Sequence, residues 1–261
     1  MLAKREHIKN LPILYAEVLK KGRIGEHQIN SIAVTQGPGL EPALWTGIVF
    51  AKELAEKLKI PLVPANHMEG HIVSTLIEKI DPEFSNLKSI NFPALALLIS
   101  GGHTELVKID ALGSYEILGS TVDDAVGEAF DKVARMLQLP YPGGPEISKL
   151  AELARSEHTE KKISLPRPML HSKNLNFSFS GLKTSVLYML KEIGTPSQEQ
   201  LKDIAREFED AVTEVLISKT QEAIGEYGPQ TLILGGGVVA NKHIRAAFDQ
   251  LAGTHNIPLY M

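Results

Sequence analysis

Ala94-Leu-Ala-Leu-Leu-Ile99 is followed directly by Ser100-Gly-Gly-His-Thr104, so a continuous apolar run of strand length ends on a glycine turn. A run of this kind without polar interruption is typical of a strand that is buried on both faces. The glycines leave unhindered backbone N–H groups at the end of the strand, where a phosphate can bind. Since a lone Gly-Gly after a strand is more often a plain turn, the stretch needs support from elsewhere in the chain.

The same pattern occurs again on both sides of this stretch. Thr231–Leu234 predicts a strand that ends in Gly235-Gly-Gly237, with a helix expected to begin near Asn241. Towards the N-terminus, the β-branched run Ser31–Thr35 stops at Gln36-Gly-Pro-Gly39. None of these turns has the lysine of a Walker loop or the spacing of a dinucleotide fingerprint. Strands that end in glycine turns and lead into helices indicate an α/β protein, and two of the turns together favour nucleotide binding.

A polar segment at 81–91 reads as a linker between two lobes. We therefore expect an N-terminal lobe over residues 1–91 and a C-terminal lobe over residues 92–261. A helical, loop-rich insertion without a clear strand is expected at about 140–203.

Composition excludes several classes of protein. The chain has 261 residues, 43% of them hydrophobic, and a net charge of −4, which argues against a protein that coats nucleic acid through bulk electrostatics. There is no cysteine, so a metal would need histidine, carboxylate or water as ligands. Neither a membrane-spanning run nor the apolar core of a signal peptide is visible, and a cytoplasmic location is the expectation.

His67 and His71 stand one helical turn apart on a predicted helix, close enough for both imidazoles to bind one ion. The spacing resembles the zinc-protease signature, in which a glutamate directly follows the first histidine. Here Met68 holds that position and Glu69 lies about 100° further round the helix. Spacing alone leaves two readings open, a metal site or two ordinary histidines on a polar face.

Asp124, Glu128 and Asp131 are expected to share one stripe of a helix over about 122–139. Acidic residues near the start of a helix are favoured by its dipole, which accounts for Asp124 without a functional role. The dipole does not account for Asp131, two turns further along, and we expect Asp131 to be functional.

Together with a series of short motifs, these elements closely resemble one family, the tRNA N6-adenosine threonylcarbamoyltransferases, formerly labelled O-sialoglycoprotein endopeptidases. The motifs occur in the family's order along essentially the whole chain. They are Thr35-Gln-Gly-Pro-Gly-Leu40, Asn66-His-Met-Glu-Gly-His71, Leu98-Ile-Ser-Gly-Gly-His-Thr104, Gly127-Glu-Ala-Phe-Asp131-Lys132, Tyr141-Pro-Gly-Gly-Pro145, Asn176-Phe-Ser-Phe-Ser-Gly-Leu-Lys183 and Gly235-Gly-Gly-Val-Val-Ala-Asn241.

The resemblance implies a fold like that of actin, Hsp70 and the sugar kinases, with two ribonuclease-H-like lobes and helical insertions. It implies a divalent metal on His67 and His71, with iron (Fe2+) expected and zinc as the alternative. Ser148 falls at a further substrate position, where some members carry aspartate. The family's site for its adenylate intermediate maps onto Leu98, Ile99, Ser100, Gly101, Gly102, Asp131, Gly144 and Asn241.

The implied reaction is transfer of a threonylcarbamoyl group from threonylcarbamoyl-AMP to an adenine amine in tRNA. The acceptor adenosine lies 3′ to the anticodon in tRNAs that read codons beginning with A. The implied partners are tRNA, a homologous accessory subunit and an accessory ATPase of the bacterial type, with no membrane. The residues give no evident general base, and none is assigned.

The chain departs from the family pattern at its two ends. Family members begin with a strand and a Thr-Ser-Cys-Asp-Asp-type turn, which we do not find before the first helix. They end with an Asp-Asn segment whose aspartate is the third metal ligand, whereas this sequence stops at Pro258-Leu-Tyr-Met261. The expectation is therefore that both segments are missing, and that the 261-residue chain alone binds metal poorly and is inactive or impaired.

Three other functions remain as alternatives. A metalloprotease is suggested by the histidine pair and the old family label, although the displaced Glu69 argues against it. A non-catalytic scaffold of the same family would generally lack His67 and His71. A sugar or acetate kinase of the same fold group would have no use for the His-Met-Glu-Gly-His segment.

Overall fold

The computed structural model describes residues 2–77, 90–157 and 162–261. The chain divides into two compact units, Met1–Val73 and Ser74–Met261. The expected lobe boundary at residue 91 stays a prediction, because most of the polar segment at 81–91 lies outside the described residues.

The first unit is built on two parallel strands, β1 (Ile32–Gly37) and β2 (Leu62–Asn66), in a register that pairs Ile32 with Leu62. A helix joins the two strands, as a parallel pair requires. That helix packs on β1 and on the preceding α1. The unit's other elements are α1 (Leu2–Gly22), η1 (Glu26–Gln28), the connecting α2 (Glu41–Leu58) and the first part of α3 (His67–Leu76).

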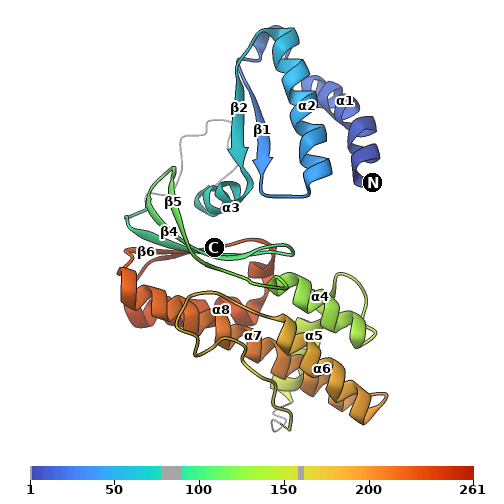
Figure 1. Cartoon of the computed structure of the whole chain (residues 1–261), viewed down its shortest axis with the longest axis vertical. Coiled ribbons are helices and arrows are strands. Elements are labelled where there is room, and N and C mark those ends of the chain that lie inside the picture. The colour runs from blue at the N-terminus through green and yellow to red at the C-terminus, as the bar shows by residue number, and fades with distance from the viewer. Residues whose placement is uncertain (1, 78–89, 158–161) are drawn as a thin grey trace. The chain divides into compact units, whose positions relative to one another are not determined.

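The second unit, which includes the strands labelled β4, β5 and β6 in Figure 1, contains a five-stranded mixed sheet in the order β5-β4-β3-β6-β7. β3 lies at its centre, antiparallel to β4 and parallel to β6. Its residues are all buried, as the apolar run predicts. The strands are β3 (Ala94–Ile99), β4 (Thr104–Ala111), β5 (Ser114–Ser120), β6 (Thr231–Gly235) and β7 (Leu259–Tyr260).

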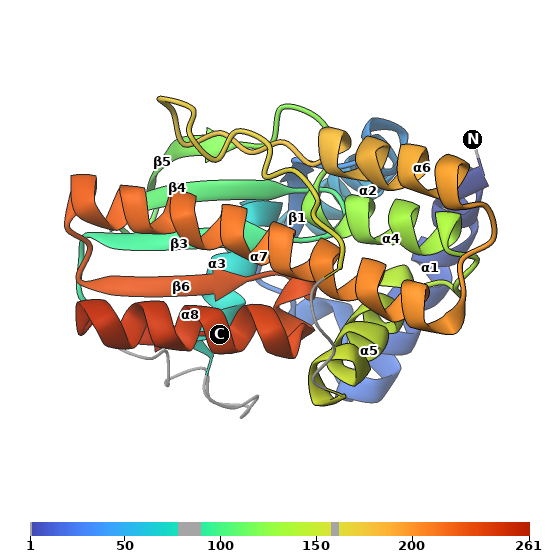
Figure 2. The ribbon, with the colours of Figure 1, turned by 90° about the horizontal axis from the view of Figure 1, so that it is seen from below.

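Helices α7 and α8 run across one face of this sheet, while α4, α5 and α6 gather beyond one of its ends (Figure 2). Alternate residues of β3 join the core beneath these helices, where Phe130 and Phe208 meet edge to face with ring centroids 5.0 Å apart. None of the described helices combines the length and apolarity that a bilayer crossing needs. The helices are α4 (Val126–Met136), α5 (Gly143–Ser156), α6 (Ser180–Ile193), α7 (Gln198–Tyr227), η2 (Gly237–Ala240) and α8 (Lys242–His255).

The prediction that Asp124 shares a helix face with Glu128 and Asp131 is wrong. α4 begins at Val126, so Asp124 lies in the turn before the helix and not on its surface. The reason is that Asp124 is held by two lysines, Lys132 at 2.7 Å and Lys183 at 3.0 Å, and Lys183 comes from α6. Asp124 therefore ties two helices together.

Candidate functional site

The two glycine turns of the second unit lie side by side because β3 and β6 are parallel neighbours, with Leu98 paired to Gly235. Their carboxyl ends consequently meet at the same edge of the sheet. Gly236 has a φ of 99°, and a Cβ at this position would lie 2.3 Å from the carbonyl oxygen of Ile99. Only glycine fits there, so Gly236 is fixed by the packing of one turn against the other.

Gly101 and Gly237, one from each turn, line a single cavity of about 630 Å³. A Cβ at either position would meet no described atom within 4 Å, so packing within the protein does not require glycine there. Their bare backbones border the cavity, where a ligand could approach them closely.

Three helices begin at this cavity. Gly127 belongs to the first turn of α4, Gly144 to that of α5, and Asn241 is the N-cap of α8. The amino-terminal ends of three helices thus border one space, which favours a negatively charged ligand. The lining residues come from these helix starts, from the glycine turns and from α7: Gly101, Gly127, Phe130, Asp131, Pro142, Gly144, Pro145, Ser148, Lys149, Glu152, Arg155, Glu209, Gly237, Val238, Ala240, Asn241, Lys242 and His243.

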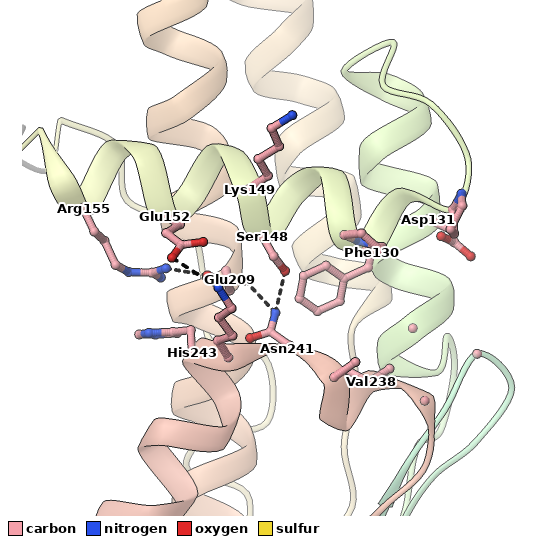
Figure 3. Close-up of a pocket in the computed structure, with 18 residues that line it drawn as sticks. Phe130, Asp131, Ser148, Lys149, Glu152, Arg155, Glu209, Val238, Asn241 and His243 are labelled. Carbon is pink, nitrogen blue, oxygen red and sulfur yellow. Dashed lines mark hydrogen bonds and ion pairs between the residues drawn. The ribbon is translucent and has the colours of Figure 1, made fainter.

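Asn241 is at the centre of the polar contacts in the cavity wall (Figure 3). Its Oδ1 accepts a hydrogen bond from the backbone N–H of Ile244 at 2.9 Å, which caps α8. Its Nδ2 donates to Ser148 Oγ at 2.8 Å and to Glu209 Oε1 at 2.6 Å. One side chain thus connects α5, α7 and α8.

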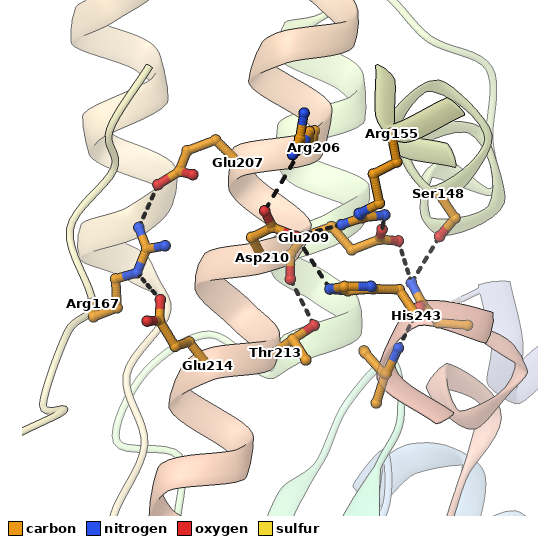
Figure 4. Close-up of polar contacts among 12 residues, drawn as sticks. Ser148, Arg155, Arg167, Arg206, Glu207, Glu209, Asp210, Thr213, Glu214 and His243 are labelled. Atoms are coloured by element: carbon orange, nitrogen blue, oxygen red, sulfur yellow. Dashed lines mark hydrogen bonds and ion pairs between the residues drawn. The ribbon is translucent and has the colours of Figure 1, made fainter. Parts of the chain in front are cut away.

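Glu209 is 1% exposed and carries the network further into the protein. Its Oε2 accepts from Arg155 at 2.5 Å, and Arg155 also donates to Asp210 at 2.5 Å (Figure 4). Burial lowers the pKa of Arg155, but the hydrogen bonds to Asp210 and Glu209 raise it more, so its pKa lies above the ordinary value. His243 Nε2 contacts Asp210 Oδ1 at 3.1 Å.

Asp131 has a structural contact as well as a place in the cavity wall. Its Oδ1 accepts from the backbone N–H of Gly143 at 2.8 Å and so anchors the turn that starts α5. That turn is tightly packed, since a Cβ at Gly143 would lie 2.3 Å from the Cβ of Ala134.

The structure gathers part of the predicted adenylate site around this cavity. Gly101, Asp131, Gly144 and Asn241 line it, together with Ser148. The remaining predicted residues are not among those that line it. Leu98 and Ile99 are buried in β3, and Gly102 is exposed. The carbonyl oxygen of Ser100 accepts a hydrogen bond from the backbone N–H of Gly127 at 3.2 Å.

Sequence reasoning missed Glu209 and Arg155. Both look like ordinary charged residues on helices, and they meet across 54 positions of the chain. A single sequence holds no signal for such a contact. The burial of Glu209 is the one feature that sets it apart, and burial becomes visible only in the fold.

The histidine pair belongs to the first unit. Asn66 Oδ1 accepts from the backbone N–H of Met68 at 2.8 Å, so Asn66 caps α3 and places His67 in its first turn. The rings of His67 and His71 have centroids 4.7 Å apart. Two imidazoles one turn apart fit as two ligands of one ion, whereas no group of three or more His, Cys, Asp or Glu side chains that could hold a metal ion occurs among the described residues.

Comparison with known proteins identifies relatives over the whole chain. The family model for TsaD, tRNA N6-adenosine threonylcarbamoyltransferase, matches residues 1–261. Proteins of that name from Chromobacterium violaceum and Ralstonia pickettii are each 44% identical over 263 residues. Both matches cover 99% of this chain, with 74% of the Chromobacterium protein and 72% of the Ralstonia protein covered in turn.

Solved structures show the same fold at low sequence identity. HypF from T. kodakarensis gives a TM-score of 0.62 at 14% identity, covering 96% of this chain and 40% of that one. A full-length HypF in a phosphate- and nucleotide-bound form gives 0.63 at 15% identity, with 94% and 46% covered. These likenesses bear on the fold alone and confirm the expected α/β fold class.

Proposed function

The chain belongs to the family of tRNA N6-adenosine threonylcarbamoyltransferases, and from this premise we propose that it transfers a threonylcarbamoyl group to the N6 amine of an adenosine in tRNA. The acceptor is the adenosine 3′ to the anticodon in tRNAs that read codons beginning with A. The observation that carries the proposal is the 44% identity to enzymes of this name over 99% of the chain. The names of these relatives favour acyl transfer over the protease and scaffold alternatives.

The donor we propose is threonylcarbamoyl-AMP, bound with its AMP part in the cavity of the second unit. The backbones of Gly101 and Gly237 and the starts of α4, α5 and α8 suit a phosphate, since N–H groups and positive dipole ends gather there. The same groups would stabilise the charge on AMP as it leaves. Because the adenine amine is a weak nucleophile, catalysis depends mainly on holding donor and acceptor in position.

We further propose that His67 and His71 hold one divalent metal ion, iron or zinc, with further ligands from elsewhere. Imidazole suits both metals, so the donor set does not choose between them. When bound, such an ion would supply Lewis-acid chemistry, polarising the oxygens that coordinate it. The proposed protein partners are a homologous accessory subunit and an ATPase.

The function is tested by incubating the protein that carries this chain with tRNA, threonine, bicarbonate, ATP and its partner proteins. Nucleosides from the tRNA are then separated and weighed by mass spectrometry. We expect threonylcarbamoyladenosine in the complete reaction. A complete, active partner system that leaves the tRNA unmodified contradicts the proposal.

The metal proposal has its own prediction and control. His67→Ala and His71→Ala should each lower the iron or zinc content of the purified protein, measured by elemental mass spectrometry, and should lower product formation. His27→Ala, at an exposed position of the same unit, should change neither. Metal content equal to wild type in both histidine variants would show that the ion, if any, is held elsewhere.

A further inference from the structure

We infer that Glu209 is a positioning residue which, through Asn241, fixes the Ser148 hydroxyl as a hydrogen-bond donor to the ligand of the cavity. The inference rests on the proposed function for the class of ligand, a nucleoside monophosphate with acceptor oxygens on its phosphate and ribose. It assigns to Asn241 the role of orienting Ser148 and not of donating to the ligand.

The orientation of the Asn241 amide follows from its surroundings. The backbone N–H of Ile244 can only donate, so the Asn241 atom that faces it at 2.9 Å must be the oxygen. The amide nitrogen then necessarily faces Ser148 Oγ and Glu209 Oε1 (Figure 3). A flipped amide would set two donors against each other at α8 and is therefore excluded.

Both hydrogens of the amide are thereby committed. One goes to the Glu209 carboxylate, which can only accept, and the other goes to Ser148 Oγ. The Asn241 side chain has no donor left for a ligand. Because Ser148 Oγ accepts from Asn241, its own proton is available, and Ser148 lines the cavity.

Glu209 fixes the direction of these hydrogen bonds because it is an anion whose second oxygen is bound by Arg155. Arg155 donates to its second oxygen, and the carboxylate is 1% exposed, so water cannot replace either partner. A neutral glutamine could accept from only one of its two donors, Arg155 or Asn241. The direction of the whole chain of hydrogen bonds therefore depends on the charge of Glu209.

An isosteric double variant separates this role from a structural one. In Glu209→Gln with Asn241→Asp, the glutamine oxygen still accepts from Arg155 and its nitrogen donates to the aspartate. Aspartate caps a helix as well as asparagine does, so the contact to Ile244 is kept. The Ser148 proton, however, must now point to the aspartate and is lost to the ligand. Side-chain sizes and net charge are unchanged.

The test measures binding of AMP by calorimetry and stability by urea unfolding. The double variant should unfold at nearly the wild-type urea midpoint but bind AMP about ten- to a hundredfold more weakly, the usual effect of losing a hydrogen bond to a charged group. Ser148→Ala should weaken AMP binding by a similar factor, and should add little in the double background. Ser156→Ala, on the same helix with its hydroxyl bonded to Leu153 O, serves as the control and should leave affinity unchanged.

Wild-type AMP affinity in either the double variant or Ser148→Ala overturns the inference, as does the absence of AMP binding to the wild-type protein. Formation of threonylcarbamoyladenosine by wild type is scored separately. Modified tRNA with Ser148→Ala indistinguishable from wild type removes the inference and leaves the proposed function intact. Unmodified tRNA together with the predicted pattern of AMP affinities supports the inference and contradicts the proposed function.

Discussion

Two adjacent glycines in the turn after β6, Gly236 and Gly237, have different roles. Gly236 is required by the fold, because its φ is positive and the Ile99 carbonyl oxygen occupies the place of a side chain. Gly237 lines the cavity, and a Cβ added there would meet no described atom within 4 Å. Stability and ligand binding should therefore separate at adjacent positions.

Gly236→Ala should lower the free energy of unfolding by about 2 kcal/mol or more, because alanine is strained at this φ and its Cβ would overlap Ile99 O. Gly237→Ala should leave it within about 0.5 kcal/mol of wild type, yet weaken AMP binding about tenfold, because the methyl group takes space from the ligand. Urea unfolding and calorimetry on both variants measure the two effects. Equal stability of the two variants would contradict this division.

Asp124 gives the protein a pH-dependent contribution to stability. Burial raises its pKa, but hydrogen bonds from Lys132 and Lys183 lower it more, so its pKa in the folded protein lies below the ordinary value of about 3.9. The stabilisation is therefore complete above the unfolded pKa and is lost as pH falls through the folded one. Asp124→Asn should cost about 1 kcal/mol near neutral pH, and the difference should shrink below about pH 4. A difference that grows on acidification would show that the shift has the other sign.

Part of the cavity wall could be predicted from the sequence. Asp131 and Asn241 were expected, Asp131 because the helix dipole could not account for its place and Asn241 because of the family motif. Glu209 and Arg155 could not be found, since their meeting depends on how α5 packs against α7. Asp124 was assigned to a helix because a local pattern does not reveal a lysine that arrives from α6.

Among the elements, α7 does more than cover the sheet. It carries the buried Glu209, and it also carries Lys219, which is 0% exposed. Lys219 Nζ donates to the backbone oxygens of Ser172 at 3.1 Å and Asn174 at 2.6 Å. These bonds hold the loop that leads into α6, so α7 organises both the cavity wall and this loop.

Lys219→Met should lower the free energy of unfolding by about 2–3 kcal/mol, because it removes the hydrogen bonds that a buried ammonium group donates to Ser172 and Asn174. Peptides covering 171–175 should also exchange amide hydrogen for deuterium faster. Lys202→Met on the same helix removes a partly exposed ion pair with Glu157 and should cost less than about 1 kcal/mol. Comparable losses in the two variants would show that the buried contacts of Lys219 have no special importance.

Elements with strong local signals were predicted well. β3 has the predicted bounds, since an apolar run between a proline and a glycine turn admits few alternatives. α7 begins at Gln198, inside the segment at about 140–203 that was expected to be a helical, loop-rich insertion, because Ser197 and Gln200 form a capping box that starts the helix in a polar stretch. Periodicity of apolar residues cannot show such a start.

At the scale of the whole molecule, the two units carry different parts of the proposed chemistry. The first holds the histidine pair on α3, and the second holds the cavity at the ends of β3 and β6. The division into two α/β units with glycine turns was predictable from the repeated strand-turn-helix pattern. The cavity itself was not, because its walls come from α4, α5, α7 and α8 as well as from the turns.

The central claim is that this cavity binds the AMP part of the donor, and a crystal structure of the protein with AMP tests it most directly. The account predicts the phosphate against the backbones of Gly101 and Gly237, with Ser148 Oγ within hydrogen-bond distance of a ligand oxygen. AMP bound outside this cavity, or inside it with Ser148 turned away, would contradict the account.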